Sequence, residues 1–260
     1  MRVCQFRHFP GKPLVLQYSR ALPHQHGAGS IPVIMVRSKP DLRDPGRSMT
    51  PSNDSANQIP DIVIGRLPVY LRALERLAQG DSDITSSHEL GLRLGISSAQ
   101  IRKDLSHFGG FGKQGTGYDV RYLVRQLKQV LNVDQVWQVA LVGAGDLGRA
   151  IANYHGFAER SFHIACVFDV DPGKFGQSVG ACRVQDFHQA GPIIQRMGIQ
   201  VAMIAVPATS AQDVAKELVR HGVRAMLNYA PISLTVPAGV RVQHIDPVVH
   251  LQHMTYYLSE

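Results

Sequence analysis

The chain has 260 residues, of which 44% are hydrophobic, and a formal net charge of +7. This length allows one large domain or two modest ones, and no apolar run approaches the roughly 20 residues that a membrane-spanning helix needs. The three cysteines contain no CxxC pair, which excludes a disulfide framework and a zinc knuckle. We therefore expect a cytoplasmic protein without a membrane segment.

The positive charge is concentrated in the first half. Residues 1–60 hold 8 Lys/Arg against 3 Asp/Glu, residues 61–131 hold 10 against 7, and residues 132–260 hold 9 against 10. This distribution fits a nucleic-acid contact made by the first half alone. Imbalances of this size are also common in proteins that bind no nucleic acid, so the charge does not decide the question.

Residues 1–57 show no sustained period, and they contain seven prolines and the polar segment SMTPSNDSANQ. This composition predicts a disordered leader. Met49 is a plausible alternative start of the chain, because the residues before it do not resemble a domain.

Helical periodicity begins at Ile62 and continues through RLPVYLRALERLAQ to a stop at Gly80. Pro68 fits the first turn of this helix, or a kink after a short lead-in turn. Two short helices should follow. Ser86 precedes Glu89, and Ser97 precedes Gln100, at the spacing of helix-capping serines. Two short helices joined by a tight turn that contains glycine predict a helix-turn-helix.

The glycine-rich segment GGFGKQGTGYDV suggests a β-hairpin wing, and RYLVRQLKQVL at 121–131 predicts a fourth helix. Residues 58–132 are therefore expected to form a winged-helix DNA-binding domain. Its third helix would bury Ile101, Leu105 and Phe108 and turn its polar side chains toward the major groove. An ordinary solvated helical bundle would show the same pattern. The expected DNA contacts are Ser97, Ser98, Gln100, Arg102, Lys103, Ser106 and Lys113.

From Gln138 onward the apolar runs QVALVG, HIACVFD, VAMIAVP and VRAMLNYAP alternate with helical segments such as AQDVAKELVRHG. Strands fed by crossover helices predict a mostly parallel sheet, covered on both faces, over residues 133–245.

The motif Gly143-x-Gly145-x-x-Gly148 follows the first strand of this sheet and opens a helix, and Asp169 lies 21 residues after its last glycine. Strand, glycine turn, helix and acid in this register are typical of a dinucleotide site, and the acid favours NAD(H) over NADP(H). A glycine turn without a ligand is the alternative. Thr209 or Ser210 could cap a later helix at the same crevice. The expected cofactor contacts are Gly143, Ala144, Gly145, Asp146, Leu147, Gly148, Asp169, Val206 and Pro207.

Residues for catalysis are hard to find in this sequence. It contains no Tyr-x-x-x-Lys and no His–Asp pair at a recognisable spacing, so we expect no catalytic site. Tyr154 and His155 follow the nucleotide helix as possible acid/base groups. His250 and His253 lack a third ligand, so no metal site is expected. Cys166, within IACVF, is expected to be a small buried hydrophobe.

Residues 246–260 end the chain with an amphipathic segment that places Val248, Leu251, Met254 and Leu258 on one face of a helix. Such a face needs a surface to cover it. A second copy of the chain and the chain's own sheet are the two candidates.

The stretches TSSHELGLRLGISSAQIRKDLSHFGGFGKQGTGYDV, VALVGAGDLGRAIANYHGF, VFDVDP and LNYAP together resemble the redox-sensing transcriptional repressor family Rex, over about residues 59–260. The resemblance implies an α/β homodimer in which a winged helix-turn-helix domain precedes a Rossmann-like NAD(H)-binding domain. A C-terminal helix swaps between subunits. Such a repressor binds palindromic operators of double-stranded DNA while NAD⁺ dominates, and NADH releases it.

The resemblance also implies roles for single residues. Tyr154 matches a tyrosine close to the nicotinamide, and Arg72 and Asp246 match positions of the switch between the DNA-bound and NADH-bound forms. Pro247 departs from the family, which usually has Leu or Phe there; a proline can begin the swapped helix but cannot supply the same large apolar contact near the nicotinamide. Two functions of other classes remain as alternatives: a small NAD-dependent oxidoreductase with a helical appendage, and a structural subunit that binds a nucleotide or CoA.

Overall fold

The computed structural model describes residues 59–80, 82–109, 112–113 and 117–258. The leader expected at 1–57, with Met49, lies outside this part of the chain. The described residues fall within one compact unit, Ser55–Glu260. Among them, no helix has the length and apolar character needed to cross a membrane.

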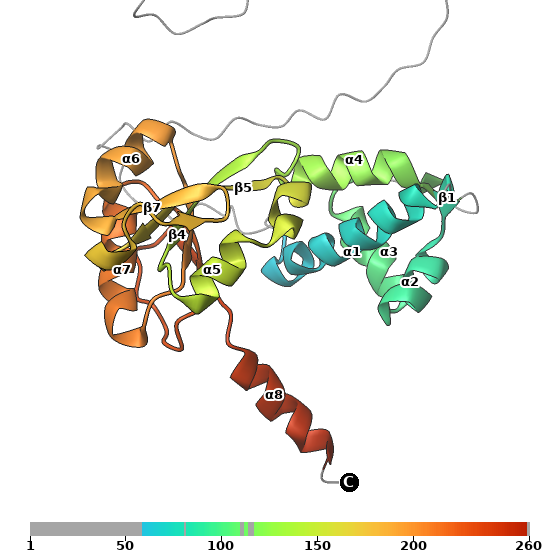
Figure 1. Cartoon of the computed structure of the whole chain (residues 1–260). Helices are drawn as coiled ribbons and strands as arrows, with labels where there is room; N and C mark the ends of the chain where they lie inside the picture. The colour runs from blue at the N-terminus through green and yellow to red at the C-terminus, as the bar shows by residue number, and fades with distance from the viewer. Residues whose placement is uncertain (1–58, 81, 110–111, 114–116, 259–260) are drawn as a thin grey trace, which may run out of the picture. The chain divides into compact units, whose positions relative to one another are not determined.

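The first half of the described chain is mainly helical (Figure 1). Its small sheet is antiparallel, in the order β1-β3-β2. This arrangement confirms the expected helix-turn-helix and hairpin, although the hairpin tip at 114–116 lies outside the described residues. The elements are α1 (Asp61–Gln79), β1 (Ile84–Thr85), α2 (Ser87–Leu94), α3 (Ser98–Ser106), β2 (Gly112–Lys113), β3 (Gly117–Asp119) and α4 (Val120–Val130).

Serine caps begin both short helices, as their spacing predicts. The amide of Glu89 donates to Ser86 Oγ at 3.1 Å, and the amide of Gln100 donates to Ser97 Oγ at 3.2 Å. Each cap satisfies an amide that has no partner within its own helix. Gly95 then ends α2 with a φ of 66°, in the left-handed region that glycine adopts readily.

Of the two positions expected for Pro68, the first turn of the helix is wrong, and a position after lead-in turns is the one observed. Helix α1 begins at Asp61, so Pro68 lies in the helix interior. The buried side chains of Val63 and Leu67 extend the apolar stripe toward the N-terminus. Packing of this stripe stabilises the two turns that precede the proline.

The second half is built on a seven-stranded sheet in the order β10-β9-β8-β4-β5-β7-β6. All neighbouring pairs are parallel except β6 with β7, which confirms the expected mostly parallel sheet. The elements are β4 (Trp137–Val142), α5 (Asp146–Ala152), β5 (Phe162–Asp169), β6 (Ser178–Val179), β7 (Cys182–Asp186), α6 (Ala190–Met197), β8 (Val201–Ile204), α7 (Ala208–Arg220), β9 (Ala225–Asn228), β10 (Arg241–His244) and α8 (Pro247–Thr255).

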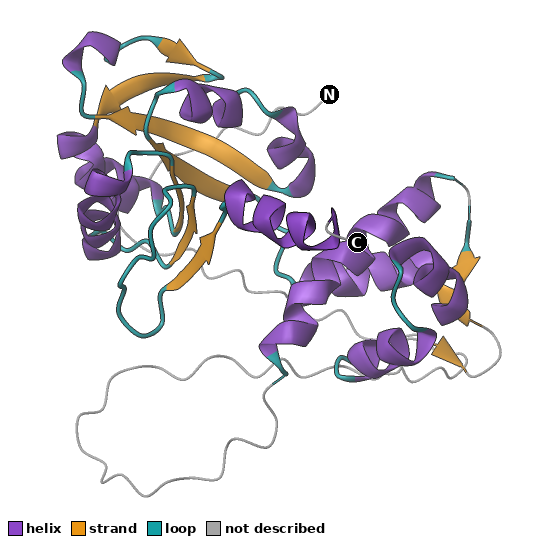
Figure 2. Ribbon diagram, turned by 90° about the horizontal axis from the view of Figure 1, so that it is seen from below, coloured by secondary structure: helices purple, strands orange, loops and turns teal. Residues whose placement is uncertain are grey.

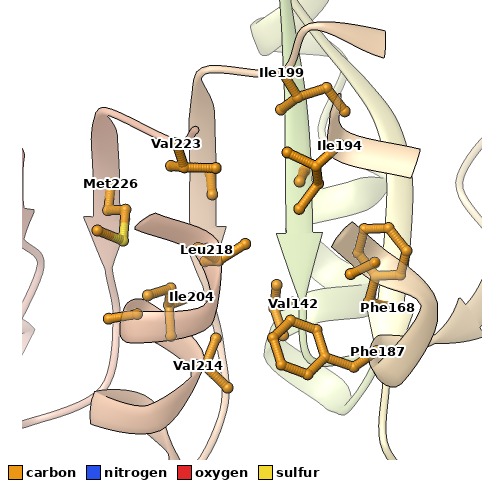
Figure 3. Packing of buried hydrophobic residues seen from close by; sticks show 14 of the residues in the cluster. Val142, Phe168, Phe187, Ile194, Ile199, Ile204, Val214, Leu218, Val223 and Met226 are labelled. Carbon is orange, nitrogen blue, oxygen red and sulfur yellow. The ribbon is translucent and has the colours of Figure 1, made fainter. Parts of the chain in front are cut away.

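Helices cover both faces of this sheet (Figure 2). Along β4, Ala140 and Val142 pack with α6 and α7, while Val139 and Leu141 pack on the side of α5. Figure 3 shows the first of these clusters, in which Phe168 and Phe187 meet edge to face. Because both faces are buried, the central strands are continuous apolar runs, which is why they could be predicted.

Two further expectations concern single residues. The cap expected from Thr209 or Ser210 was wrong, because α7 begins at Ala208 and its cap position is Pro207, which makes no side-chain cap bond. The expectation for Cys166 is confirmed, since the residue is 1% exposed. Burial raises the pKa of its thiol to about 12, so it is not a reactive thiolate at neutral pH.

Candidate functional site

In the turn between β4 and α5, the backbone requires glycine at two of the three glycine positions. Gly143 has a φ of 105°, and a Cβ there would lie 2.2 Å from the carbonyl oxygen of Ala205. A Cβ on Gly148 would lie 1.8 Å from the carbonyl oxygen of Gly143. Both contacts are far too short, so these glycines allow α5 to pack against the end of the sheet.

Gly145 differs from its two neighbours. A Cβ built on it would meet nothing within 4 Å, and its φ of −76° suits any residue. The fold therefore does not need glycine at this position. The open space lies at the N-terminus of α5, where backbone amides have no partner within the helix. A phosphate group approaching these amides would fill that space, so the turn fits the pyrophosphate of a dinucleotide.

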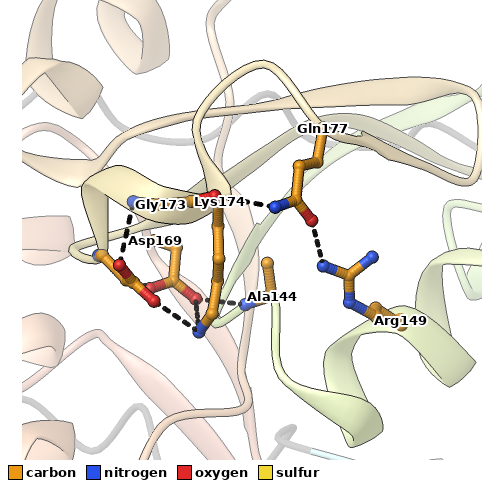
Figure 4. A network of polar contacts seen from close by, with 7 residues as sticks. Ala144, Arg149, Asp169, Gly173, Lys174 and Gln177 are labelled. Atoms are coloured by element: carbon orange, nitrogen blue, oxygen red, sulfur yellow. Dashed lines mark hydrogen bonds and ion pairs between the residues drawn. The ribbon is translucent and has the colours of Figure 1, made fainter.

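Asp169 ends β5, the strand beside β4, and is 7% exposed. Its Oδ2 accepts hydrogen bonds from the amide of Ala144 at 2.7 Å and from Lys174 Nζ at 3.0 Å, and its Oδ1 accepts from the amide of Asp171 at 3.0 Å (Figure 4). A carboxylate has about four acceptor positions, so one remains for a ligand hydroxyl.

Burial alone would raise the pKa of Asp169. The hydrogen bonds from Asp171, Ala144 and Lys174 outweigh that effect and hold the pKa below its usual value. The carboxylate is therefore ionised at neutral pH. A fixed negative charge beside the turn would repel a 2′-phosphate and would accept a hydrogen bond from a ribose hydroxyl.

Lys174 belongs to this site, and sequence reasoning missed it. It lies in the short 3₁₀ helix Pro172–Lys174 and forms an ion pair with Asp169. The same loop is tied to α5, because Gln177 Nε2 donates to the carbonyl of Gly173 and Gln177 Oε1 accepts from Arg149 at 2.6 Å (Figure 4). A basic residue five positions after the acid was the only sequence feature that pointed to it.

The other expected cofactor contacts divide into two groups. Asp146 and Leu147 are exposed in the first turn of α5, and Val206 follows β8 close to Gly143. Tyr154 and His155 instead follow the C-terminal end of α5, away from the glycine turn. The structure does not bring them to the turn within one chain, so the nicotinamide role of Tyr154 stays a prediction.

Helix α3 has a buried face and an exposed face, as the spacing predicts. Ile101 and Leu105 are buried, whereas Arg102, Lys103 and Ser106 are exposed. The exposed side chains have neighbours of their own: Arg102 Nη1 donates to Ser87 Oγ at 3.0 Å, and Ser106 Oγ donates to the carbonyl of Lys103. Lys113 lies on β2, and its side chain is outside the described residues.

The remaining expected DNA contacts are less exposed. Ser97 caps α3 and is exposed, while Ser98 is half-buried. Gln100 is also half-buried, and its Nε2 donates to Asp104 Oδ1 at 2.7 Å. Asp104 itself is fully buried and was not singled out from the sequence.

The two expected switch residues lie at different places in the chain. Arg72, on α1, lines a cavity of about 530 Å³ with Leu71 of α1, Leu131 after α4 and Phe162 of β5. Asp246 caps α8, because its Oδ1 accepts from the amide of Val248 at 2.9 Å. Pro247 occupies the first position of α8 and begins the helix without strain.

Helix α8 and the short 3₁₀ helix Tyr256–Leu258, drawn in red in Figure 1, have no buried residue. Among the described residues of one chain, the apolar face is therefore uncovered and does not pack on the sheet. The face is formed by Val248, Leu251, Met254 and Leu258, which are 56%, 60%, 61% and 82% exposed.

Two protein families match this chain. A family described as "Putative DNA-binding protein N-terminus" matches residues 58–106, and one described as "CoA binding domain" matches residues 134–232. Among curated relatives, the "Redox-sensing transcriptional repressor Rex" of Roseiflexus sp. (strain RS-1) is 51% identical over 206 residues, which cover 79% of this chain and 94% of the relative.

Solved structures of RSP, described as a Rex-family repressor, are also similar. A crystal structure of RSP in complex with beta-NAD⁺ and operator DNA has a TM-score of 0.74 and 38% identity, and covers 77% of this chain and 93% of RSP. A crystal structure with beta-NADH has a TM-score of 0.70 and 36% identity, over 77% of this chain and 94% of RSP.

Proposed function

This chain belongs to the Rex family of redox-sensing transcriptional repressors, and we propose that it binds palindromic operators while NAD⁺ dominates and leaves them when NADH accumulates. Its relatives are regulators, so the chain is a regulator and not an enzyme. One observation carries the proposal: a helix-turn-helix with an exposed basic face and an open glycine turn beside an ionised aspartate occur in the same chain.

The DNA contact is assigned to helix α3 and the wing. Arg102 and Lys103 lie on the exposed face of α3, and a recognition helix in the major groove uses such side chains for base edges and phosphates. Ser97, Ser98, Gln100 and Ser106 of the same helix and Lys113 of the wing complete the proposed contacts. The relative RSP forms a crystalline complex with operator DNA, which supports a partner of this kind.

The nucleotide contact is assigned to the glycine turn and to Asp169. The turn would hold the pyrophosphate at the N-terminus of α5, and Asp169 would hold the adenine ribose. The two redox forms of the bound nucleotide differ in charge, because the nicotinamide ring carries a positive charge in NAD⁺ and none in NADH. In this proposal the protein binds the two forms with different affinities and transfers no hydride.

The proposed assembly is a homodimer in which α8 packs on the partner subunit. The apolar face of α8 is uncovered in the part of one chain that the structure describes, whereas burying a Leu, Val or Met side chain stabilises a protein by about 1.5–3 kcal/mol. The cavity beside Arg72 is the surface that we assign to the partner's helix, because its lining includes Leu71, Leu131 and Phe162. Asp246 at the start of α8 would then come near this region.

Thermodynamics sets one requirement on such a switch. NADH can shift the population only if it binds the DNA-incompetent form more tightly than the DNA-competent form, and the two nucleotides can act differently only if NAD⁺ has a smaller preference of this kind. A tenfold change in the ratio of the two forms needs a difference of about 1.4 kcal/mol between the nucleotides. We assign Arg72, Asp246 and Tyr154 to this coupling. A repressor must reach the chromosome, so we propose a cytoplasmic location.

The experiment that tests the DNA contact compares variants of the full chain on one palindromic duplex, obtained by selection from a random library. Substituting Arg102 or Lys103 with Ala should weaken DNA binding about tenfold or more. Each substitution should also reduce the slope of the logarithm of the binding constant against the logarithm of the salt concentration by roughly one. Arg241→Ala, which changes an exposed arginine on β10, is the matched control. Equal losses for all three variants would contradict the assignment of α3.

A further inference from the structure

Asp104 is a fully buried carboxylate on the helix that we assign to the DNA groove. Its Oδ2 accepts from Arg66 Nε and from the Tyr70 hydroxyl, both at 2.6 Å. Its Oδ1 accepts from Arg66 Nη2 at 2.8 Å and from Gln100 Nε2 at 2.7 Å. Four donors fill the acceptor positions of the carboxylate, and they come from two helices, α1 and α3.

The charge of Asp104 follows from these contacts. Burial would raise the pKa of the carboxyl group, but the hydrogen bonds from Arg66, Tyr70 and Gln100 outweigh it and lower the pKa to about 2. At neutral pH Asp104 is therefore a carboxylate that can only accept hydrogen bonds.

An acceptor-only neighbour decides which way the carboxamide of Gln100 faces. A Gln side chain can in general turn over and exchange its oxygen and nitrogen. Beside Asp104 it cannot, because two oxygens that both accept would repel each other. The nitrogen of Gln100 must face Asp104, and its carbonyl oxygen must face away. Within the described residues, this oxygen accepts no hydrogen bond, and Gln100 is half-exposed in the first turn of α3.

We propose that Asp104 is a positioning residue that fixes Gln100 as an oriented reader of one base in each half of the operator. This inference rests on the proposed function, because it takes α3 as the helix in the groove. The oriented side chain presents one carbonyl oxygen and one remaining N–H. Adenine offers a complementary N6 amino donor and N7 acceptor, whereas guanine and thymine place an acceptor opposite the carbonyl oxygen.

The simpler alternative is that Gln100 only stabilises Asp104 and touches no base. The two accounts differ in what a substitution changes. If Gln100 is structural, its loss weakens binding to all sequences alike. If Gln100 is oriented for reading, its loss removes the preference at one position and leaves the other positions intact.

The test selects sites from a duplex library randomised across a two-fold symmetric sequence, using the full chain. The wild type should enrich adenine at one position of each half-site. Gln100→Ala should lose about five- to tenfold of that preference, roughly the value of one direct base contact, and keep the others. Asp104→Asn should relax the same position, because an Asn amide can face Gln100 with either group and lets its carboxamide turn over.

Two comparisons separate positioning from plain stability. Tyr70→Phe removes one donor to Asp104 but leaves the contact with Gln100, so it should lower the melting temperature and keep the base preference. The double variant Gln100→Ala/Asp104→Asn should show the same preferences as Gln100→Ala alone. If Asp104→Asn does not fold, Gln100→Ala still decides whether Gln100 reads a base, on which the inference depends, because Arg66 and Tyr70 continue to satisfy the carboxylate.

An unchanged preference in Gln100→Ala or in folded Asp104→Asn, or a uniform loss of affinity across all sequences, would overturn the inference. A wild-type protein that enriches no sequence would overturn the proposed function and this inference with it.

Discussion

Gly145→Ala and Gly148→Ala add the same methyl group at positions three residues apart. The first should weaken nucleotide binding and the second should destabilise the fold. At Gly145 the new Cβ meets no protein atom within 4 Å, and the backbone already has a conformation that alanine adopts. The only expected cost is a poorer helix cap, about 0.5 kcal/mol. The melting temperature of the nucleotide-free protein should therefore fall by less than about 2 °C.

At Gly148 the new Cβ would lie 1.8 Å from the carbonyl oxygen of Gly143. A normal carbon–oxygen contact is about 3.3 Å, so α5 would have to move by about 1.5 Å. Overpacking of this kind costs about 1–3 kcal/mol or more. For a chain of this size the melting temperature should fall by about 5–10 °C.

Gly145→Ala, the variant with the smaller loss of stability, should nevertheless lose affinity for the nucleotide. In Gly145→Ala the methyl group occupies the space that we assign to the pyrophosphate, so NADH should bind at least about tenfold more weakly to a protein of nearly normal stability. The assay is thermal melting without nucleotide, followed by calorimetric titration with NADH. Wild-type affinity in Gly145→Ala would refute the assignment of the turn.

Three further predictions use other residues. Asp104 has a lowered pKa, so its stabilising effect should be complete above about pH 4 and lost as the pH falls toward 2. In urea unfolding, the free energies of unfolding of wild type and Asp104→Asn should therefore converge as the pH is lowered from about 4 to about 2. Asp169→Ser should shift the affinity ratio of NADH to NADPH by at least about tenfold toward NADPH in fluorescence titrations, because Lys174 is freed for a 2′-phosphate. Leu251→Asp should dissociate the proposed dimer in sedimentation experiments at concentrations where Gln252→Asp, with the same charge on the same helix, does not; equal behaviour of the two would argue against burial of the α8 face.

The elements that could be predicted are those whose local sequence pattern directly reflects how they pack or how they end. The strands beside the glycine turn are buried on both faces, so they are long apolar runs. The serine caps and Gly95 act within three or four residues of themselves. By contrast, β7 has the sequence CRVQD, and its pairing with β5 and β6, rather than its own pattern, makes it a strand. Strands β6 and β10 were missed for the same reason.

The candidate site was predictable in part. Gly143, Gly145, Gly148 and Asp169 follow from a spacing that reflects one local geometry. Lys174 did not, because its role depends on how the following loop folds back on Asp169. The partners of Asp104 on α1 are 34 and 38 residues away in the sequence, so no local pattern indicates that this residue is buried and ion-paired.

The most direct test of the central claim follows a labelled palindromic duplex by fluorescence anisotropy at fixed salt. The duplex is bound by the full chain, and NADH and NAD⁺ are added in separate titrations. The account predicts that NADH releases the DNA at a concentration at least about tenfold below that of NAD⁺, and that Gly145→Ala stays bound at that concentration. Release by both nucleotides at equal concentration, or by neither, would contradict it.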